Sequence, residues 1–198
     1  MNLLFHTADH AGHDPTVADP GHPERPARLD TVAPALEAAE NRGWVRRPHP
    51  PAGDEALLRL HPASHLAWLE QLAAAGGGRV EADTCVTPNS VTVARGAVGA
   101  ALAAVDAVLT EDDTNRAFCA VRPPGHHARP FEDRGAMGFC LFANAALAAA
   151  HARATHGLDR VLVVDFDVHH GNGTQDLMWD EARCLFASTH QMPLYPGS

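Results

Sequence analysis

The chain has 198 residues, and 45% of them are hydrophobic, which is enough for one domain with a substantial core. Fifteen lysines and arginines against 24 acidic residues give a formal net charge of −9, and the lack of a basic run argues against a nucleic-acid surface. The four cysteines form no CxxC pair, which indicates buried thiols in a reducing cytosol. We find neither a signal peptide nor an apolar run of the roughly 18 residues needed to cross a membrane. We therefore expect a cytoplasmic protein that contacts neither nucleic acid nor membrane.

Segments with strand and helix patterns alternate along the chain. Residues 1–7 have the pattern of an apolar strand, and residues 8–28, rich in Gly, Pro, Asp and His, that of a long loop. Apolar residues spaced by three and four predict helices over 26–41 and 61–78, the second ended by three glycines. The remaining segments are a turn over 83–90, a long alanine-rich helix with a polar tail at 111–114, a strand over 116–121, a helix over 140–157 and a strand over 160–167.

This order of segments predicts the fold class. The predicted strands are apolar runs rather than alternating patterns, which is typical of a parallel sheet with helices on both faces. No repeat, low-complexity linker or second domain interrupts the pattern. We therefore expect one α/β domain over residues 1–198.

Two histidine-rich motifs follow two of the predicted strands. Ligands bind parallel sheets outside the carboxyl ends of the strands, which is where PPGHH (123–127) and DFDVHHGNG (165–173) are expected. In an extended segment Asp165, Asp167 and His169 share one face, so Asp167 and His169 can reach one ion. Carboxylate and imidazole without thiolate suit a catalytic Zn²⁺ or Fe²⁺ rather than a structural zinc site.

Each motif also has a simpler explanation. Asp165 and Asp167 could cap the following turn, and tandem histidines are often solvated loop residues or part of another metal cluster. A second histidine pair after a neighbouring strand favours the catalytic interpretation. A hydrolytic metal needs an imidazole that takes a proton from water and returns it to the leaving amine, and His126 and His127 are suitably placed for this.

The motifs together resemble those of a known family. RPPGHHA (122–128), GFCLF (138–142) and VLVVDFDVHHGNGTQ (161–175), in this order and spacing, are similar to segments of zinc-dependent histone deacetylases and bacterial deacetylase-like amidohydrolases. HPERPARL (22–29) resembles the class II branch. The resemblance covers nearly the whole chain, and it implies an arginase-deacetylase α/β fold.

The resemblance also implies roles for individual residues. It assigns Zn²⁺ to Asp167 and His169. The implied catalytic group consists of two imidazoles and the side chains that fix their orientation and tautomer: His126 with Asp165, and His127 with Asn172. A structural monovalent cation, K⁺, is implied mostly at main-chain oxygens, and its matching positions are Asp165, Asp167, His169, Ser188 and Thr189.

An acyl-lysine tunnel is a further implication. Phe139, beside Gly138 in GFC, matches one aromatic wall and Tyr195 matches the opposite wall, because two rings can hold an aliphatic stem between them. Without the motifs, both rings would be interpreted as ordinary core aromatics. Asp83, by its position before TPNS, matches the rim residue that holds the substrate backbone.

Two features depart from the family's pattern. Where the family has two asparagines after GFCxF, this chain has Ala143 and Asn144. The family's third metal ligand, an aspartate, and its carbonyl-polarising tyrosine match positions beyond Ser198. We therefore interpret the chain as the N-terminal portion of a longer enzyme. We expect the 198-residue chain alone to be inactive and to expose an apolar sheet face, unless His22 or His190 replaces the missing ligand.

Three functions compete. The first is a zinc-dependent hydrolase that removes acetyl groups from acetyl-lysine, an acetylpolyamine or a small acetylated amine. The second is a non-catalytic remnant that binds acyl-lysine or a partner chain, with oligomer formation left open. The third is a ureohydrolase with two Mn²⁺ ions, which fits less well because His170 stands where a second ion would need an aspartate.

Overall fold

The computed structural model describes residues 1–7, 9–130 and 135–198. Ala8, the first residue of the expected long loop, lies outside the described residues. The strands are β1 (Asn2–His6), β2 (Trp44–Arg47), β3 (Gly78–Glu81), β4 (Thr84–Val86), β5 (Arg116–Ala120), β6 (Val161–Asp165) and β7 (Cys184–Ser188). The helices are α1 (Ala27–Asp30), α2 (Ala33–Glu40), α3 (Asp54–Leu57), α4 (Ala63–Ala74), α5 (Ser90–Thr110), α6 (Asn144–His156) and α7 (Asn172–Met178), with short 3₁₀ helices η1 (His10–Gly12) and η2 (Pro15–Val17) in the long loop.

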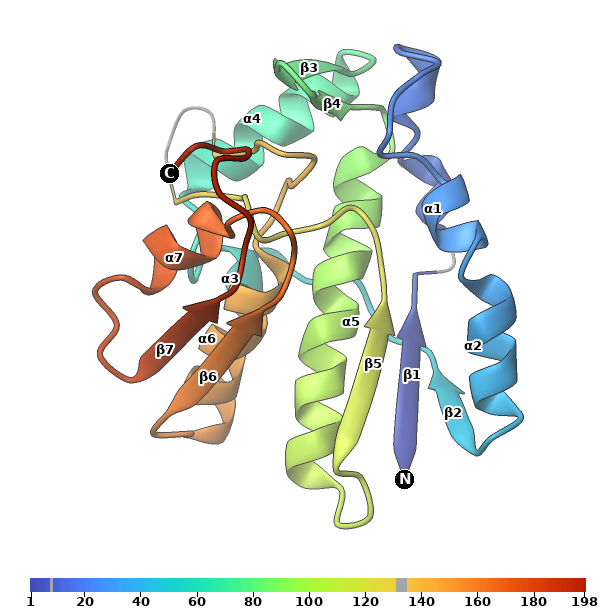
Figure 1. Cartoon of the computed structure of the whole chain (residues 1–198), viewed down its shortest axis with the longest axis vertical. Helices are drawn as coiled ribbons and strands as arrows, with labels where there is room; N and C mark the ends of the chain where they lie inside the picture. Colours follow the sequence, from blue (N-terminus) through green and yellow to red (C-terminus); the bar gives the residue numbers. More distant parts are fainter. Residues whose placement is uncertain (8, 131–134) are drawn as a thin grey trace.

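The longer strands pair in parallel in two groups (Figure 1). β1 lies between β2 and β5, with Leu4 opposite Phe118, and β6 pairs with β7, with Val163 opposite Phe186. Among the described residues β5 and β6 do not pair with each other, and β3 and β4 form a separate antiparallel hairpin. Because all five parallel strands point the same way, the loops after β5 and β6 leave at the same end of the molecule (Figure 1).

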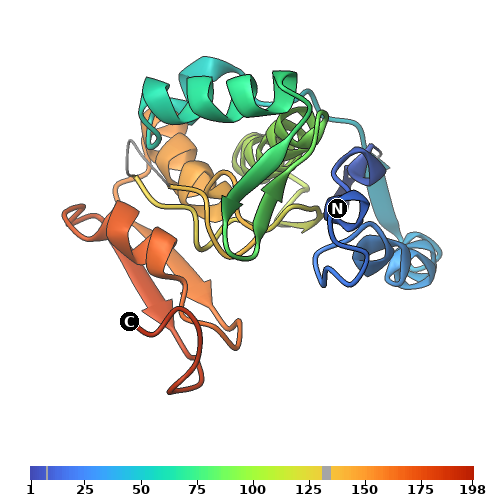
Figure 2. The same ribbon diagram turned by 90° about the horizontal axis from the view of Figure 1, so that it is seen from above.

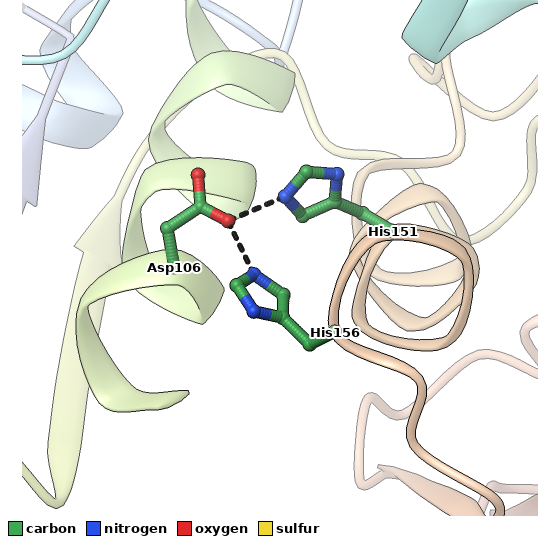
Figure 3. A group of neighbouring side chains, drawn as sticks. All are labelled: Asp106, His151 and His156. Atoms are coloured by element: carbon green, nitrogen blue, oxygen red, sulfur yellow. Dashed lines mark hydrogen bonds and ion pairs between the residues drawn. The ribbon is translucent and has the colours of Figure 1, made fainter. Parts of the chain in front are cut away.

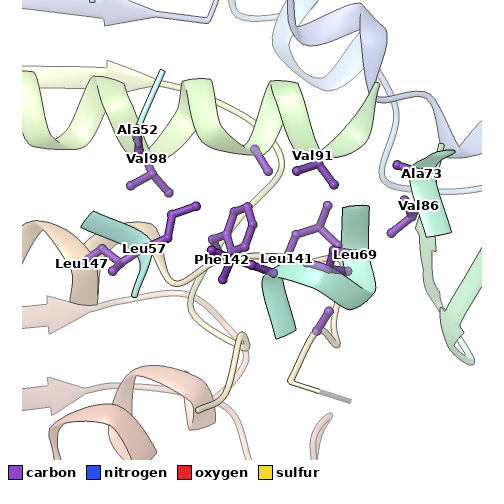
Figure 4. Packing of buried hydrophobic residues seen from close by; sticks show 13 residues of the cluster. Ala52, Leu57, Leu69, Ala73, Val86, Val91, Val98, Leu141, Phe142 and Leu147 are labelled. Carbon is purple, nitrogen blue, oxygen red and sulfur yellow. The ribbon is translucent and has the colours of Figure 1, made fainter. Parts of the chain in front are cut away.

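Helix α5 is the centre of the core. It packs against β1, β5 and α6, and its small side chains, including Ala97, Ala100 and Ala104, are buried. A second set of buried side chains fills the space between α5, α4 and the segment before α6 (Figure 4); it includes Leu57, Leu69, Val91, Val98, Leu141, Phe142 and Leu147. Burial of each large side chain of this kind stabilises the fold by roughly 1.5–3 kcal/mol.

The strands differ in how their faces are covered. β1 is covered by α5 on one face and by α1 and α2 on the other, where Leu29 and Leu36 pack. β6 and β7 pack against α6 and α7 on one face, but Leu162, Val164 and Leu185 on the other are 57%, 57% and 64% exposed. Seen from above, the β6–β7 pair lies on the opposite side of the molecule from α4 (Figure 2). The exposed side chains of β6 and β7 form an apolar sheet face of the kind expected from the sequence.

Helix α5 bears on the expectation that the protein does not contact a membrane. It has 21 residues and is long and apolar enough to cross a membrane by length and composition. Arg95 and Asp106 interrupt its apolar sequence, which is why no continuous run stood out. In the structure much of this helix is buried in the core. Core helices of globular proteins have the same length and composition, so α5 is only weak evidence for a membrane span.

Several segments differ from their predicted boundaries. The helix expected over 26–41 is broken into α1 and α2, because Pro34 has no N–H to donate to the preceding turn. The helix expected from residue 140 begins at Asn144, because Met137 and Cys140 form a short β-bridge before it. The turn expected over 83–90 contains strand β4. The other strands and helices predicted from the sequence are present.

Candidate active site

The two histidine-rich segments meet beyond the carboxyl ends of β5 and β6. His126 Nδ1 lies 2.9 Å from Asp165 Oδ2, and His127 Nδ1 lies 2.7 Å from Asn172 Oδ1. The two imidazole rings are neighbours, with centroids 4.0 Å apart. The amide N–H of Thr174 donates to the His126 carbonyl at 3.0 Å, which ties the first turn of α7 to the loop after β5. The structure thus brings each of the two histidines together with the oxygen partner that the resemblance implies.

The oxygen partners determine which ring nitrogen carries the proton. A carboxylate or amide oxygen accepts, so Nδ1–H of each imidazole donates to it and Nε2 keeps a lone pair. Burial, together with the electrostatic effect of the neighbouring His126 ring, lowers the pKa of His127 to about 4. His127 is therefore neutral at pH 7. In this form its Nε2 can accept a proton.

The two aspartates are held in their ionised form. Burial favours protonation of Asp165 and Asp167, but hydrogen bonds outweigh it, so the pKa of each lies below its ordinary value. Asp165 accepts from His126 and from the amide N–H of Asp167 at 3.0 Å. Asp167 in turn accepts from the amide N–H of His169 at 2.8 Å. These bonds hold the two carboxylates of Asp165 and Asp167 in place and keep them negatively charged.

Asp167 and His169 form the candidate metal-ligand pair. His169 Nδ1 lies 3.0 Å from Asp167 Oδ1, so an imidazole nitrogen and a carboxylate oxygen converge. The side chains of His169 and Asp167 are 39% and 48% exposed, which leaves them open to an ion from solvent. An oxygen and nitrogen donor set without thiolate fits a catalytic Zn²⁺, which takes three protein ligands and a water. The described residues bring two of these ligands together here.

The two histidines considered as substitute ligands have other partners. His190 Nδ1 lies 2.8 Å from Ser188 Oγ, and its ring lies 4.7 Å from that of His170. His22 Nε2 lies 2.9 Å from the carbonyl oxygen of Asp83. Within the described ranges, three metal-ligating side chains come together at another place, between α5 and α6, and not at the candidate active site.

Two glycines allow the close approach of chains at the site. A Cβ atom at Gly171 would lie 2.2 Å from Asp165 Oδ2, and one at Gly138 would lie 2.3 Å from His127 Cδ2. Gly138 also has a φ of +54°, which favours glycine. Phe139 follows with a φ of +69°, an uncommon conformation for a bulky residue that is often found at functional sites. Small residues are thus required where the imidazole is seated.

The two predicted tunnel aromatics have different neighbours. The Tyr195 ring packs edge-on against His127, at 5.0 Å between centroids, and against His169, at 6.1 Å. The Phe139 ring packs edge-on against His22 at 5.3 Å, and its amide N–H donates to Thr84 Oγ1 at 2.9 Å. Tyr195 therefore lies directly beside the catalytic candidates, and Phe139 lies against the loop that carries HPERP.

An acidic rim lies next to Tyr195. Burial and the nearby Asp83 raise the pKa of Glu81, and burial together with the charges of Glu81 and Asp83 raises the pKa of Tyr195. Sequence reasoning identified Asp83, and it considered His22 only as a substitute metal ligand, but it missed Glu81 and Thr84. Only the tertiary structure shows them at the site, because β3 and β4 bring the carboxylates to the loop after β5 from a distant part of the sequence.

The expected monovalent-cation positions cluster around the ends of β6 and β7. Asp165 and Ser188 are partners in the strand register, and the Thr189 amide N–H donates to the Asp165 carbonyl at 3.0 Å. Asp167 and His169 follow in the same loop. These residues are adjacent, and their role in holding K⁺ remains a prediction.

A buried ion pair supports the loop that carries the histidines. The side chains of Glu24 and Arg122 are 0% and 2% exposed, and both guanidinium Nε and Nη2 donate to the two carboxylate oxygens. Arg122 immediately precedes the PPGHH motif. A third donor of Arg122 reaches the His10 carbonyl, so the pair joins the long loop to the end of β5. No pattern in the sequence indicates that these two residues are partners.

Ala143 and Asn144, which stand where the family has two asparagines, both make hydrogen bonds. Asn144 Nδ2 donates to the Pro123 carbonyl at 3.2 Å, and the Ala143 amide N–H donates to His61 Nε2 at 3.0 Å. Asn144 thus retains a contact with the PPGHH segment. Ala143 contributes only its backbone.

Comparisons with known proteins agree with this geometry. Residues 22–198 match the histone deacetylase domain family. The chain is 42% identical over 202 residues to the uncharacterized protein slr0245 of Synechocystis sp., covering 100% of this chain and 64% of that protein. It is 44% identical over 177 residues to the histone deacetylase-like amidohydrolase of Pseudomonas aeruginosa, covering 89% of this chain and 46% of that protein. The crystal structure of the HDA15 HD domain is similar with a TM-score of 0.90 at 32% identity, covering 100% of this chain and 57% of that one.

These similarities settle the class of protein. The arginase-deacetylase α/β fold expected from the sequence is confirmed by the likeness to the HDA15 HD domain. The chain belongs to the histone deacetylase family. It spans between 46% and 64% of the length of the relatives named above.

Proposed function

We propose that this protein is a zinc-dependent deacetylase that hydrolyses the acetamide of acetyl-lysine or a similar alkyl amine to acetate and a free amine. The observation that carries the proposal is the pair of imidazoles, each backed by an oxygen acceptor, beside a converging carboxylate and imidazole. His126 and His127 supply the first feature, and Asp167 and His169 the second. Membership of the histone deacetylase family supports the same reaction class.

Asp167 and His169 would hold the metal ion. Their donor atoms are those that a catalytic Zn²⁺ prefers, and both are accessible from solvent. When bound, the ion would polarise the acetamide carbonyl and lower the pKa of water. Asp165, two residues before Asp167, instead accepts from His126, which would give the two aspartates different tasks.

The chain's own imidazoles would move the protons. His127 is neutral at pH 7 and has Nε2 available, so it can take a proton from the attacking water. The same nitrogen then returns the proton to the amine nitrogen as the C–N bond breaks. His126 would assist as an electrostatic partner, and Asp165 and Asn172 would hold the two rings in the required tautomer.

The substrate stem would lie against the aromatic groups. Tyr195 beside the histidines and Phe139 beside Gly138 offer apolar ring surface for a chain of methylenes. Asp83 would accept from the substrate backbone. The acidic side chains of Glu81 and Asp83 beside Tyr195 favour a second candidate substrate, an acetylated polyamine, because its distant ammonium group is attracted to carboxylates.

The proposal also includes a monovalent cation, a location in the cell and an alternative role. K⁺ would bind among the carbonyl oxygens at the ends of β6 and β7, where Asp165 and Ser188 are adjacent. The protein would act in the cytoplasm, without direct contact with nucleic acid or membrane. A non-catalytic role in binding acyl-lysine or a partner chain is the alternative that the experiment below would reveal.

Acetate release tests the proposal. The protein in its natural length is incubated with an acetyl-lysine peptide and, separately, with an acetylated diamine, and acetate is quantified. His127→Ala should lower turnover by at least ~100-fold while bound zinc, measured by elemental analysis, is retained. His49→Ala, which removes a half-buried histidine whose hydrogen bonds are long, 3.3 and 3.4 Å, is the matched control and should keep its activity. Equal turnover by wild type and His127→Ala would show that another group is the base.

A further inference from the structure

A second group of metal-ligating side chains lies between α5 and α6. His151 Nε2 and His156 Nε2 lie 2.6 Å and 2.7 Å from the same oxygen of Asp106, Oδ1 (Figure 3). All three potential ligand atoms lie within 4.8 Å of one another. α6 begins next to the PPGHH segment and ends at His156, so this group lies at the end of the helices away from the candidate active site (Figure 1). None of the proposed catalytic roles uses it.

The helices hold these three residues in place. Buried alanines of α5 and α6, including Ala100 and Ala149, let the two helices pack closely, so the backbones that carry the ligands have fixed positions. The amide N–H of Gly157 donates to the Arg153 carbonyl at 3.1 Å and closes α6 directly after His156. Ligands on regular, packed helices need little ordering when an ion binds.

We propose that Asp106, His151 and His156 bind a first-row divalent metal ion of the Zn²⁺ type, separate from the candidate catalytic ion. Two imidazoles and a carboxylate are a donor set that such ions prefer, and water would fill the remaining position. The ion replaces the two Nε2 protons that now point at Asp106. Ligand atoms around a tetrahedral ion with bonds of roughly 2.0–2.1 Å lie about 3.3 Å apart, so each ring retracts by about 0.7 Å.

The group is accessible to an ion without unfolding. The side chains of His151 and His156 are 13% and 16% exposed, and that of Asp106 is 49% exposed. The imidazoles are thus largely shielded, whereas the carboxylate faces solvent. An ion can approach from the carboxylate side and displace the two ring protons.

Arg59 opposes metal binding in a way that can be measured. Its Nη1 donates to His151 Nδ1 at 3.0 Å, which places the ring proton on Nε2. A metal on Nε2 requires the proton on Nδ1, where Thr155 Oγ1, 3.1 Å away, can accept it. Arg59 must then turn away, and Glu55 Oε1, 3.4 Å from Nη2, is already a second partner. Removal of Arg59 also removes a positive charge near the ion.

The competing explanation is a clamp without metal. In that case Asp106 only accepts two hydrogen bonds from the imidazoles and thereby joins α5 to α6. Both explanations allow Asp106→Asn to lower stability, so stability alone does not distinguish them. The effect of Arg59 does distinguish them, because a clamp gains nothing in metal affinity when Arg59 is removed.

Titration with Co²⁺, with Zn²⁺ as competitor, tests the proposal at pH 7. The chain carrying Asp167→Asn and His169→Gln lacks the candidate catalytic ligands and should still bind one Co²⁺ ion that Zn²⁺ displaces, seen by equilibrium dialysis and visible absorbance. Adding Asp106→Asn should weaken this binding by at least about 100-fold, whereas the matched Asp112→Asn should change it less than about twofold. Circular dichroism confirms that each variant is folded.

Arg59→Gln, made in the unaltered chain and in the same background, completes the test. It should tighten the binding of Co²⁺ to the α5–α6 group by about tenfold. Binding that is unchanged by both Asp106→Asn and Arg59→Gln would overturn the proposal, and so would a folded background chain that binds no Co²⁺. Neither result depends on whether the protein is a deacetylase.

Discussion

Replacing Gly138 by alanine would test how tightly His127, the candidate catalytic base, is packed. The new Cβ atom would lie 2.3 Å from His127 Cδ2, 2.8 Å from Cγ and 3.0 Å from Tyr195 Cε1, so the imidazole must move by about 1 Å to reach normal contact. Crowding of this kind costs roughly 1–3 kcal/mol. The φ of +54° adds about 1 kcal/mol for a residue with a side chain. The sum is about 2–4 kcal/mol.

Gly157→Ala is the matched control, because Gly157 has a φ of +70° but no atom within 4 Å of the added Cβ. It should cost only the backbone term of about 1 kcal/mol. Urea unfolding of the purified chain measures both free energies. In the protein of natural length, Gly138→Ala should also lower acetate release by about 100-fold, because a 1 Å misplacement of a catalytic group has this effect. Equal destabilisation by the two substitutions, or full activity of Gly138→Ala, would refute the reasoning.

Three other substitutions probe different parts of the structure. Asp167→Ala should abolish zinc binding at the candidate active site, whereas Asp165→Ala should keep some zinc and lose turnover; equal zinc loss, by elemental analysis, would contradict these separate roles. Glu24→Gln should lower the free energy of unfolding by about 3–5 kcal/mol, since it leaves the charge of Arg122 buried and unpaired, and a urea midpoint like that of the wild type would refute this. Burial lowers the pKa of His61 from 6.5 to about 3, so the folded state binds fewer protons than the unfolded state in that range. Stability should therefore fall on acidification from pH 6.5, and less steeply in His61→Gln; identical slopes in urea titrations would argue against it.

Much of the architecture could be predicted from local patterns. The strand that becomes β6 is a continuous apolar run, and α5 has a long alanine-rich sequence, so both were identified from the residues alone. β2, with the sequence WVRR, carries too few apolar residues to stand out, and its assignment depends on pairing with β1. β7 and α7 were likewise not predicted. The motif that precedes them was interpreted for its chemistry and not for the periodicity of its residues.

The candidate site divides in the same way. His126, His127, Asp165 and Asn172 occur in compact motifs, and the period of an extended strand explains why Asp165 and Asp167 were expected on one face. Glu81 lies far from those motifs in the sequence and reaches the site through the β3–β4 hairpin. Such long-range contacts depend on tertiary packing, which one sequence without its structure does not reveal.

Whether the protein is a metal-dependent deacetylase is tested most directly by measuring acetate release before and after metal removal. The protein of natural length is treated with a chelator, its zinc content is measured, and acetate formed from an acetyl-lysine peptide is quantified. We expect acetate release to be lost with the metal and restored by added Zn²⁺. Undiminished acetate release from protein free of metal would contradict the account.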